Sequence, residues 1–300
     1  MRVFVTGATG FIGSAVVSEL GDAGHEVLGL ARSDAAAESL ATVGAEVHRG
    51  DLGDLESLRR GAAEADGVIH CAYIHDFSQM EMAADTNNRA IETLGSALEG
   101  SGRPLVVTSG TALVAPGRPA TEADMASGGG HPRVESEWIA LALASRDVRV
   151  SILRPPPSVH GKGDHGFVPV LIDIARTKGV SAYVGDGSNR WPAVHRLDAA
   201  LLYRLALESA PAGTVLHAVA DEGVPTREIA GVIGRHLDLP VVSIEPGAAS
   251  DHFGWIGSFF ALDVPASSAL TRERMGWDPT QPGLIADLEA EHYFGVAAAA

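Results

Sequence analysis

Three glycines near the start of the chain, Gly7, Gly10 and Gly13, lie between an apolar stretch (residues 2–6) and an amphipathic one (about 11–23). In a strand that turns into a helix, Gly7 permits the tight turn, Gly10 lets a pyrophosphate approach the backbone, and Gly13 lets the helix pack on the strand. Free N–H groups at the helix start favour an anion. The G-x-x-G-x-x-G spacing predicts a dinucleotide-binding turn, with contacts from Gly7, Thr9, Gly10, Phe11, Ile12 and Gly13.

Short β-branched runs alternate with amphipathic stretches through the first half of the chain. The predicted strands cover 2–6, 26–31, 45–49, 67–72, 104–109 and 148–154, and helices are expected at 81–98 and 134–143, among others. Strands that alternate with helices are typical of a parallel sheet covered on both faces. We therefore predict an α/β protein with a doubly wound parallel sheet, a Rossmann fold.

The alternation of strands and helices stops after Arg154, where three prolines and the segment GKGDHG (161–166) interrupt regular structure. We expect a cofactor-binding Rossmann domain over 1–158, to which 190–222 returns. A smaller, discontinuous substrate-binding lobe should then comprise 159–189 and 223–300. A chain of 300 residues is long enough for one large domain or two joined lobes.

Charge and cysteine content restrict the partners. With 22 basic and 38 acidic residues the net charge is −16, which disfavours nucleic acid and anionic membranes as partners. The one cysteine, Cys71, cannot form an internal disulfide, which fits a reducing compartment. The N-terminus lacks the apolar core of a signal peptide, and no apolar run is long enough to span a membrane. We expect a cytoplasmic protein.

Further motifs follow in order along the chain: Gly50-Asp51-Leu52, Ile69-His70-Cys71-Ala72, Asn87, Val107-Thr108-Ser109-Gly110-Thr111 and Leu153-Arg154-Pro155. Together with the glycine motif they resemble the short-chain dehydrogenase/reductase superfamily, in its extended or atypical branch of epimerases, dehydratases and 3β-hydroxysteroid dehydrogenase-like reductases. The resemblance implies a nicotinamide cofactor, with contacts from Asp51, Leu52, Cys71, Ala72, Asn87, Thr108, Arg154 and Pro155. Cys71 is expected to be a small core residue rather than a nucleophile.

The end of the second strand indicates which nicotinamide cofactor binds. NAD-binding proteins of this fold usually place an acid there to bind the ribose 2′-hydroxyl. This chain has Ala31, followed by Arg32 and Ser33. A guanidinium and a hydroxyl suit a 2′-phosphate, which a carboxylate would repel, so NADP(H) is the predicted cofactor.

The Tyr-x-x-x-Lys dyad that is usual in the superfamily is absent, because none of the four tyrosines has a lysine four residues later. The segment in its place is His131-Pro132-Arg133-Val134-Glu135-Ser136-Glu137. One register puts His131 and Glu135 at the dyad positions. The other keeps Ser136 in register and puts Arg133 and Glu137 there.

Several side chains are candidates for the missing proton donor. His131 can donate a proton near neutral pH, or it can be a cap before the helix. Tyr73 and His75 follow the fourth strand, at the sheet edge where ligands of open α/β folds bind. Ser109 and Thr111 could hydrogen-bond a substrate carbonyl, although Gly110 occupies the usual catalytic hydroxyl position. No metal-binding spacing occurs, so no metal site is expected.

These observations lead to three functional hypotheses. The first is an NADP(H)-dependent oxidoreductase that transfers a hydride between nicotinamide and a small carbonyl or alcohol, using a proton donor other than the usual tyrosine. The alternatives are a catalytically silent NADP(H)-binding sensor or regulatory protein, which the missing dyad would fit, and a nucleotide-sugar epimerase or dehydratase. The family resemblance also suggests a homodimer through the helices near 81–98 and 134–146.

Overall fold

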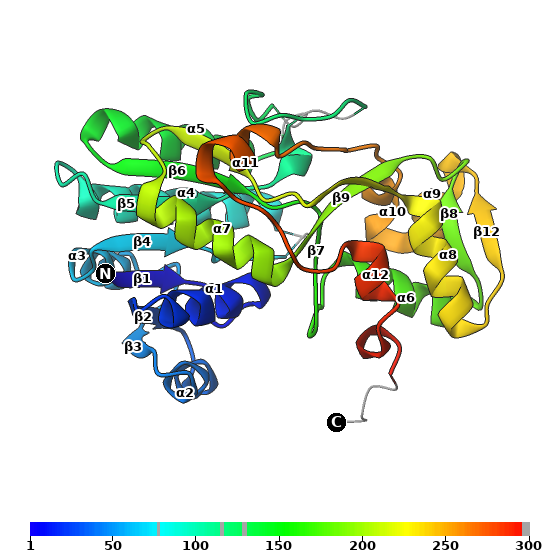
Figure 1. Ribbon diagram of the computed structural model, residues 1–300, viewed down its shortest axis with the longest axis horizontal. Helices are drawn as coiled ribbons and strands as arrows, with labels where there is room; N and C mark the ends of the chain where they lie inside the picture. Colours follow the sequence, from blue (N-terminus) through cyan, green and yellow to red (C-terminus); the bar gives the residue numbers. More distant parts are fainter. Residues whose placement is uncertain (77–78, 115–116, 128–130, 296–300) are drawn as a thin grey trace.

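The central element is a seven-stranded parallel sheet at the left of Figure 1. The computed structural model describes residues 1–76, 79–114, 117–127 and 131–295. The strand order is β10-β6-β5-β4-β1-β2-β3. The strands are β1 (Arg2–Thr6), β2 (Glu26–Ala31), β3 (Glu46–Arg49), β4 (Gly67–His70), β5 (Pro104–Thr108), β6 (Arg149–Arg154) and β10 (Thr214–His217). All neighbours run parallel, so every carboxyl end lies at one edge of the sheet.

Helices cover both faces of this sheet (Figure 1). One face packs on α1 (Phe11–Asp22), α2 (Asp34–Thr42) and α7 (Arg196–Ser209), and the other on α3 (Leu55–Ala63), α4 (Met80–Leu98) and α5 (Val134–Ala142). The pattern in α4 shows why these segments are helices: Ala90, Ile91, Leu94 and Leu98 recur at helical spacing and are fully buried. The predicted doubly wound α/β fold is confirmed.

The chain order reverses between β1 and β4, which pair with Thr6 opposite His70. Open α/β sheets bind ligands in the crevice at such a reversal. The strand expected over 67–72 ends at His70, after which Cys71 to Asp76 form a loop at the carboxyl edge. Cys71 still donates its backbone N–H to the Thr6 carbonyl, at 3.2 Å. The loop therefore starts directly beside the glycine turn.

A second group of elements lies at the right of Figure 1. It contains a sheet of β7 (Ser158–His160), β9 (Arg190–His195) and β11 (Asp221–Pro225), a parallel pair of β8 (Ser181–Val184) and β12 (Val241–Ile244), and the helices α6 (Phe167–Lys178), α8 (Thr226–Leu237), α9 (Ala249–Phe253), α10 (Gly257–Phe260) and α12 (Leu284–Leu288). Its core is aromatic: the fully buried Trp191 contacts Phe167, Phe259 and Phe260, with ring centroids 5.1–5.6 Å apart.

The remaining elements are short and connect the larger ones. They are the helix α11 (Ala269–Met275), which packs on α7, and the 3-10 turns η1 (Thr111–Leu113), η3 (Leu143–Arg146), η4 (Pro246–Ala248), η5 (Gly254–Ile256) and η6 (Glu291–Tyr293). Within the described ranges, none of the helices combines the length and the apolar character needed to cross a bilayer.

Candidate functional site

The glycine turn after β1 has the geometry that a phosphate-binding turn requires. Gly7 has a φ of +67°, and a Cβ there would lie 2.7 Å from the Ala72 nitrogen. A Cβ on Gly13 would lie 2.0 Å from the Gly7 carbonyl oxygen, so α1 and β1 can approach only without a side chain. Thr9 and Gly10 are exposed, and no side chain caps the start of α1. The turn therefore fits the pyrophosphate of a dinucleotide.

The end of β2 leaves one arginine available for a ligand. Arg32 is exposed and has no hydrogen bond or ion pair with the rest of the described chain. Ser33 caps α2, because its hydroxyl oxygen accepts a hydrogen bond from the Ala36 N–H at 3.2 Å. The nearby acid Asp34 pairs with Arg49 at 2.7 Å, so its charge is partly compensated. The cationic character of this corner rests on Arg32.

Asp51 and Leu52 lie in the turn after β3. The Asp51 Oδ1 accepts hydrogen bonds from the backbone N–H groups of Gly53 (2.7 Å) and Asp54 (3.2 Å), which makes it a turn-forming residue. Leu52 packs partly buried against the core below α3 and α4. The cofactor contact that the resemblance implies for Asp51 stays a prediction, and its carboxylate already has this local role.

Cys71 and Thr108 lie beside Tyr203, which the sequence analysis did not identify as a site residue. The Thr108 hydroxyl donates to the His70 carbonyl at 2.7 Å, so the Tyr203 hydroxyl, also 2.7 Å away, donates to Thr108. Burial raises the pKa of the Cys71 thiol to about 12, and the thiol is not a nucleophile near neutral pH. Tyr203 comes from α7 and is fully buried. Its place among the apolar residues of a predicted helix gave no signal that it would reach this edge.

A directional chain of buried hydrogen bonds starts at the end of β1. The Thr6 hydroxyl and His70 Nδ1 are 2.8 Å apart, and His70 Nε2 and Asn87 Oδ1 are 3.0 Å apart. The Asn87 amide donates to the Ser136 hydroxyl at 3.0 Å, and Ser136 donates to Asn88 at 2.6 Å. Burial lowers the pKa of His70 to about 4, so its ring is neutral and one tautomer satisfies every bond. Asn87 is therefore tied to α5 and to β4.

Tyr73, His75 and His131 gather around Arg133 at the carboxyl edge of β4. The Arg133 guanidinium carbon lies 4.0 Å from the centre of the Tyr73 ring, and the Tyr73 and His75 rings are 5.3 Å apart. His131 Nδ1 accepts the backbone N–H of Arg133 at 3.2 Å, so it helps to form the turn before α5. Burial and the arginine charge lower the pKa of both histidines, and burial raises that of Tyr73. The cluster offers neutral proton donors beside one cation.

Ser109 and Thr111 end β5 with buried, unpartnered hydroxyls. They are 5% and 2% exposed, and neither hydroxyl oxygen has a hydrogen-bond partner among the described residues. Their backbone N–H groups donate to the carbonyls of Leu153 (2.9 Å) and Pro155 (3.0 Å), which fixes the segment against the end of β6. A Cβ on Gly110 would approach only the Pro155 oxygen, at 3.8 Å. Unsatisfied buried hydroxyls are rare unless a ligand or water completes them.

Glu137, which one register puts in place of the lysine, forms a buried ion pair. Its carboxylate accepts from Arg154 Nε at 2.8 Å and Nη2 at 2.6 Å, and both side chains are at most 2% exposed. Arg154 Nη1 also donates to the Asp124 carbonyl at 2.9 Å and lies 3.2 Å from His217 Nε2. The side chain of Arg154 thus has a structural role in the interior. Glu135, which the other register puts in place of the lysine, is exposed.

The loop over 161–166, which follows β7, and Arg196 at the start of α7 lie over the start of α1. The rings of Phe11 and His165 meet edge to face at 5.6 Å, and the Arg196 guanidinium lies 4.9 Å from the Phe11 ring centre. Arg196 also donates to the Ser14 hydroxyl and to the Lys162 carbonyl, each at 3.2 Å. The segment around 161–166 therefore forms a wall beside the glycine turn.

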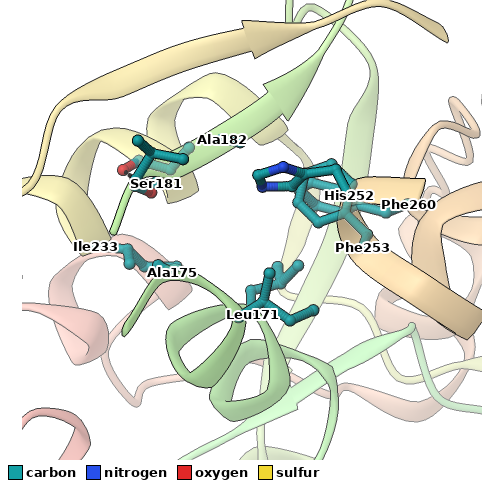
Figure 2. A pocket seen from close by; sticks show the side chains of 11 residues that line it. Leu171, Ala175, Ser181, Ala182, Ile233, His252, Phe253 and Phe260 are labelled. Atoms are coloured by element: carbon teal, nitrogen blue, oxygen red, sulfur yellow. Dashed lines mark hydrogen bonds between the residues drawn. The ribbon is translucent and has the colours of Figure 1, made fainter. Parts of the chain in front are cut away.

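A small cavity inside the second group of elements is separate from this site (Figure 2). It lies between α6, β8, α8 and α9, and its volume of about 10 Å³ accommodates roughly one water. Figure 2 shows the His252 imidazole pointing into it from α9, across from Ser181. His252 Nε2 is buried and unpartnered. The cavity is too small for an organic substrate.

Over 1–76, 79–114, 117–127 and 131–295, no three His, Cys, Asp or Glu side chains come together as a metal ion would require.

Comparison with known proteins gives the family. The sequence profile of the NAD dependent epimerase/dehydratase family matches residues 3–218. An uncharacterized protein of Schizosaccharomyces pombe is 51% identical over 295 residues, which cover 98% of this chain and 100% of that one. The 4-hydroxy-2-methyl-3-oxo-4-farnesyl-3,4-dihydroquinoline-1-oxide ketoreductase of Stigmatella aurantiaca is 27% identical over 267 residues, 85% of this chain and 80% of the relative.

A solved structure agrees with these relatives. A double mutant of the dTDP-glucose 4,6-dehydratase of Streptomyces venezuelae, with NAD and DAU bound, has a TM-score of 0.78 and 20% identity, covering 98% of this chain and 97% of that one. Identity this low shows a shared fold. The match of the family profile to most of the chain, on a sheet with the expected glycine turn, shows that the protein belongs to the NAD dependent epimerase/dehydratase family.

Proposed function

We propose that this protein is an NADP(H)-dependent oxidoreductase that transfers a hydride between nicotinamide and a small carbonyl or alcohol substrate. One observation carries the proposal: the cluster of Tyr73, His75 and Arg133 begins one residue after Ala72, whose backbone contacts Gly7. Proton donors thus adjoin the turn that fits the cofactor. The ketoreductase relative supports the choice of a reductase.

Tyr73 is the proposed proton donor. In the reductive direction the carbonyl carbon receives the hydride and the carbonyl oxygen receives a proton, which together give the alcohol. Burial raises the pKa of Tyr73, so its hydroxyl carries a proton at neutral pH. The guanidinium of Arg133, 4.0 Å from the ring centre, stabilises the phenolate that remains after transfer. The neutral His75, whose ring adjoins Tyr73, can then return a proton from solvent.

Ser109 and Thr111 are proposed to orient the substrate. Their hydroxyls are buried without partners at the end of β5, the strand beside β4 in the sheet. A substrate carbonyl oxygen would give these donors the acceptor they lack. His131 is proposed as a positioning residue, because its Nδ1 already holds the backbone of Arg133.

The preference for NADP(H) over NAD(H) is proposed from Arg32. It is exposed and unpaired with any described residue at the end of β2, where a 2′-phosphate would lie, and the neighbouring Asp34 is paired with Arg49. A guanidinium forms strong, directional bonds to phosphate. The predicted contacts of the glycine turn, Cys71 and Ala72 with the same cofactor belong to this proposal.

The test is NADPH oxidation, followed at 340 nm, with a panel of small aldehydes and ketones. Tyr73→Phe keeps the ring that stacks on Arg133 and removes only the hydroxyl. We expect it to lower kcat about 100-fold or more while the Kd for NADPH changes little. Tyr183→Phe, which makes the same change in β8, is the matched control and should keep full activity.

Two outcomes would count against the proposal. Equal activity in Tyr73→Phe and Tyr183→Phe would show that Tyr73 is not the donor. His75→Gln and His131→Gln would then be compared with Tyr183→Phe in the same way. If NADPH binds tightly but no carbonyl in the panel oxidises it, the proposed oxidoreductase activity is wrong. The missing Tyr-x-x-x-Lys dyad would then indicate a cofactor-binding sensor.

A further inference from the structure

Arg133 is a cation without an anionic partner. Its Nε is buried and has no acceptor, and its Nη2 reaches the Thr108 carbonyl only at 3.5 Å. Among the described residues, no carboxylate oxygen lies within 4.0 Å of a guanidinium nitrogen of Arg133. None of residues 77–78, 115–116 and 128–130 is acidic. A chain with 38 acidic residues thus leaves this arginine unpaired.

The contrast with Arg154 shows that the fold pairs an arginine that it buries completely, whereas Arg133 is half-buried. Arg154 is held by both oxygens of Glu137, at 2.8 and 2.6 Å. Glu137 is also the acid that acts on Arg133 from further away, and this bidentate pair already occupies it. The Arg133 Nε–H is withdrawn from water without an acceptor, which is costly, so we expect a ligand to complete it.

The three histidines and Tyr73 near Arg133 are uncharged. Burial lowers the pKa values of His70, His75 and His131, and it raises the pKa of Tyr73. At neutral pH these four groups therefore carry no negative charge that could balance the arginine. The site has a net positive centre in a protein of net charge −16.

The unpaired edge of the guanidinium indicates the shape of the anion. One face of Arg133 is covered by the Tyr73 ring, 4.0 Å away. The Nε–H, which has no partner, and Nη2, which has only the long contact to Thr108, lie on the same side of the planar group. Two parallel donors of this kind match the two oxygens of a carboxylate.

We propose that Arg133 binds the carboxylate of the substrate, and that the substrate is therefore an oxo acid or the corresponding hydroxy acid. This inference rests on the proposed function, because it places the substrate carbonyl beside the same cluster. Arg133 then has two roles, since it holds the carboxylate through its edge and stabilises the Tyr73 phenolate through its face.

Binding is the first readout, because it does not depend on turnover. The probes are 2-oxobutyrate, acetoacetate and 4-oxopentanoate, which vary the distance between carboxylate and carbonyl, with 2-butanone as the neutral match. Their Kd values are measured by NMR titration of the protein with saturating NADP⁺. We expect at least one oxo acid to bind about tenfold or more tightly than 2-butanone.

Three arginine variants separate the local effect of Arg133 from the change in charge. Arg133→Gln should weaken binding of the preferred oxo acid about tenfold or more and leave 2-butanone unchanged. Arg133→Lys should keep part of the affinity, since it retains the charge and loses the paired donors. Arg274→Gln removes the same charge from an exposed arginine without a described partner and should bind as wild type does. An unchanged Kd for NADPH verifies that each variant is folded.

The outcomes distinguish this inference from the proposed function. Failure of wild type to prefer any of the oxo acids, or an equal loss in Arg133→Gln and Arg274→Gln, overturns the carboxylate site. If neutral carbonyls oxidise NADPH while no oxo acid is preferred, the reductase survives and the carboxylate site does not. If oxo acids bind through Arg133 without NADPH oxidation, the carboxylate site survives and the proposed reaction fails.

Discussion

Acidification should destabilise the protein through His70, by an amount that can be worked out. The folded protein holds the His70 ring neutral between Thr6 and Asn87, with a pKa of about 4, against an ordinary value of 6.5. As the pH falls below 6.5 the unfolded chain takes up the proton first, so the free energy of unfolding decreases until the pH reaches about 4. Between pH 7.5 and pH 5.0 the loss from this one residue is about 2 kcal/mol.

The assay is urea unfolding of wild type and His70→Gln at pH 7.5 and 5.0. The variant is less stable at pH 7.5, because it disturbs the buried chain, but its further loss on going to pH 5.0 should be about 2 kcal/mol smaller than that of wild type. An NMR titration of the ring in the folded protein gives the pKa directly. The reasoning is refuted if both proteins lose the same stability, or if the ring titrates near 6.5.

Two further changes test the cofactor site. Gly13→Ala places a Cβ 2.0 Å from the Gly7 carbonyl oxygen and should weaken NADPH binding about tenfold or more in calorimetric titration, whereas Gly21→Ala, with nothing within 4 Å, should bind as wild type does. Arg32→Ala should raise the Kd for NADPH about tenfold or more and leave that for NADH almost unchanged. Equal losses for both cofactors would refute the phosphate assignment.

The first half of the fold could be predicted because its signals are local. The inner parallel strands, such as β1, β4 and β5, are buried on both faces and read as apolar runs, and covering helices such as α4 show amphipathic spacing. The second group of elements gave no such signal. Its strands have three to six residues, and β7 pairs with β9, which is more than thirty residues further along the chain. Short strands with distant partners leave no periodic pattern in the sequence.

The sequence predicted which segments form the candidate site, but not how their side chains contact one another. Glycine spacing located the turn, and the position of Tyr73 and His75 after a predicted strand located the sheet edge. Sequence alone left two registers open for the segment that begins at His131. Only the structure shows Arg133 stacked on Tyr73. The α7 residue Tyr203 was missed because burial inside a helix and contact with a sheet edge look the same in a sequence.

One of the two registers puts Glu137 at the lysine position of the usual dyad, and the structure disfavours a lysine there. Glu137→Lys would set a second cation against Arg154 inside a pocket where both side chains are at most 2% exposed. We expect a loss of about 3–5 kcal/mol or more, measured by urea unfolding. The control is Glu137→Lys combined with Arg154→Glu, which reverses the pair and should recover part of the stability. If Glu137→Lys alone is as stable as wild type, the pair does not fix α5. If it unfolds as expected, the segment is committed to its buried ion pair, which agrees with our proposal that the proton donor is Tyr73, beside Arg133.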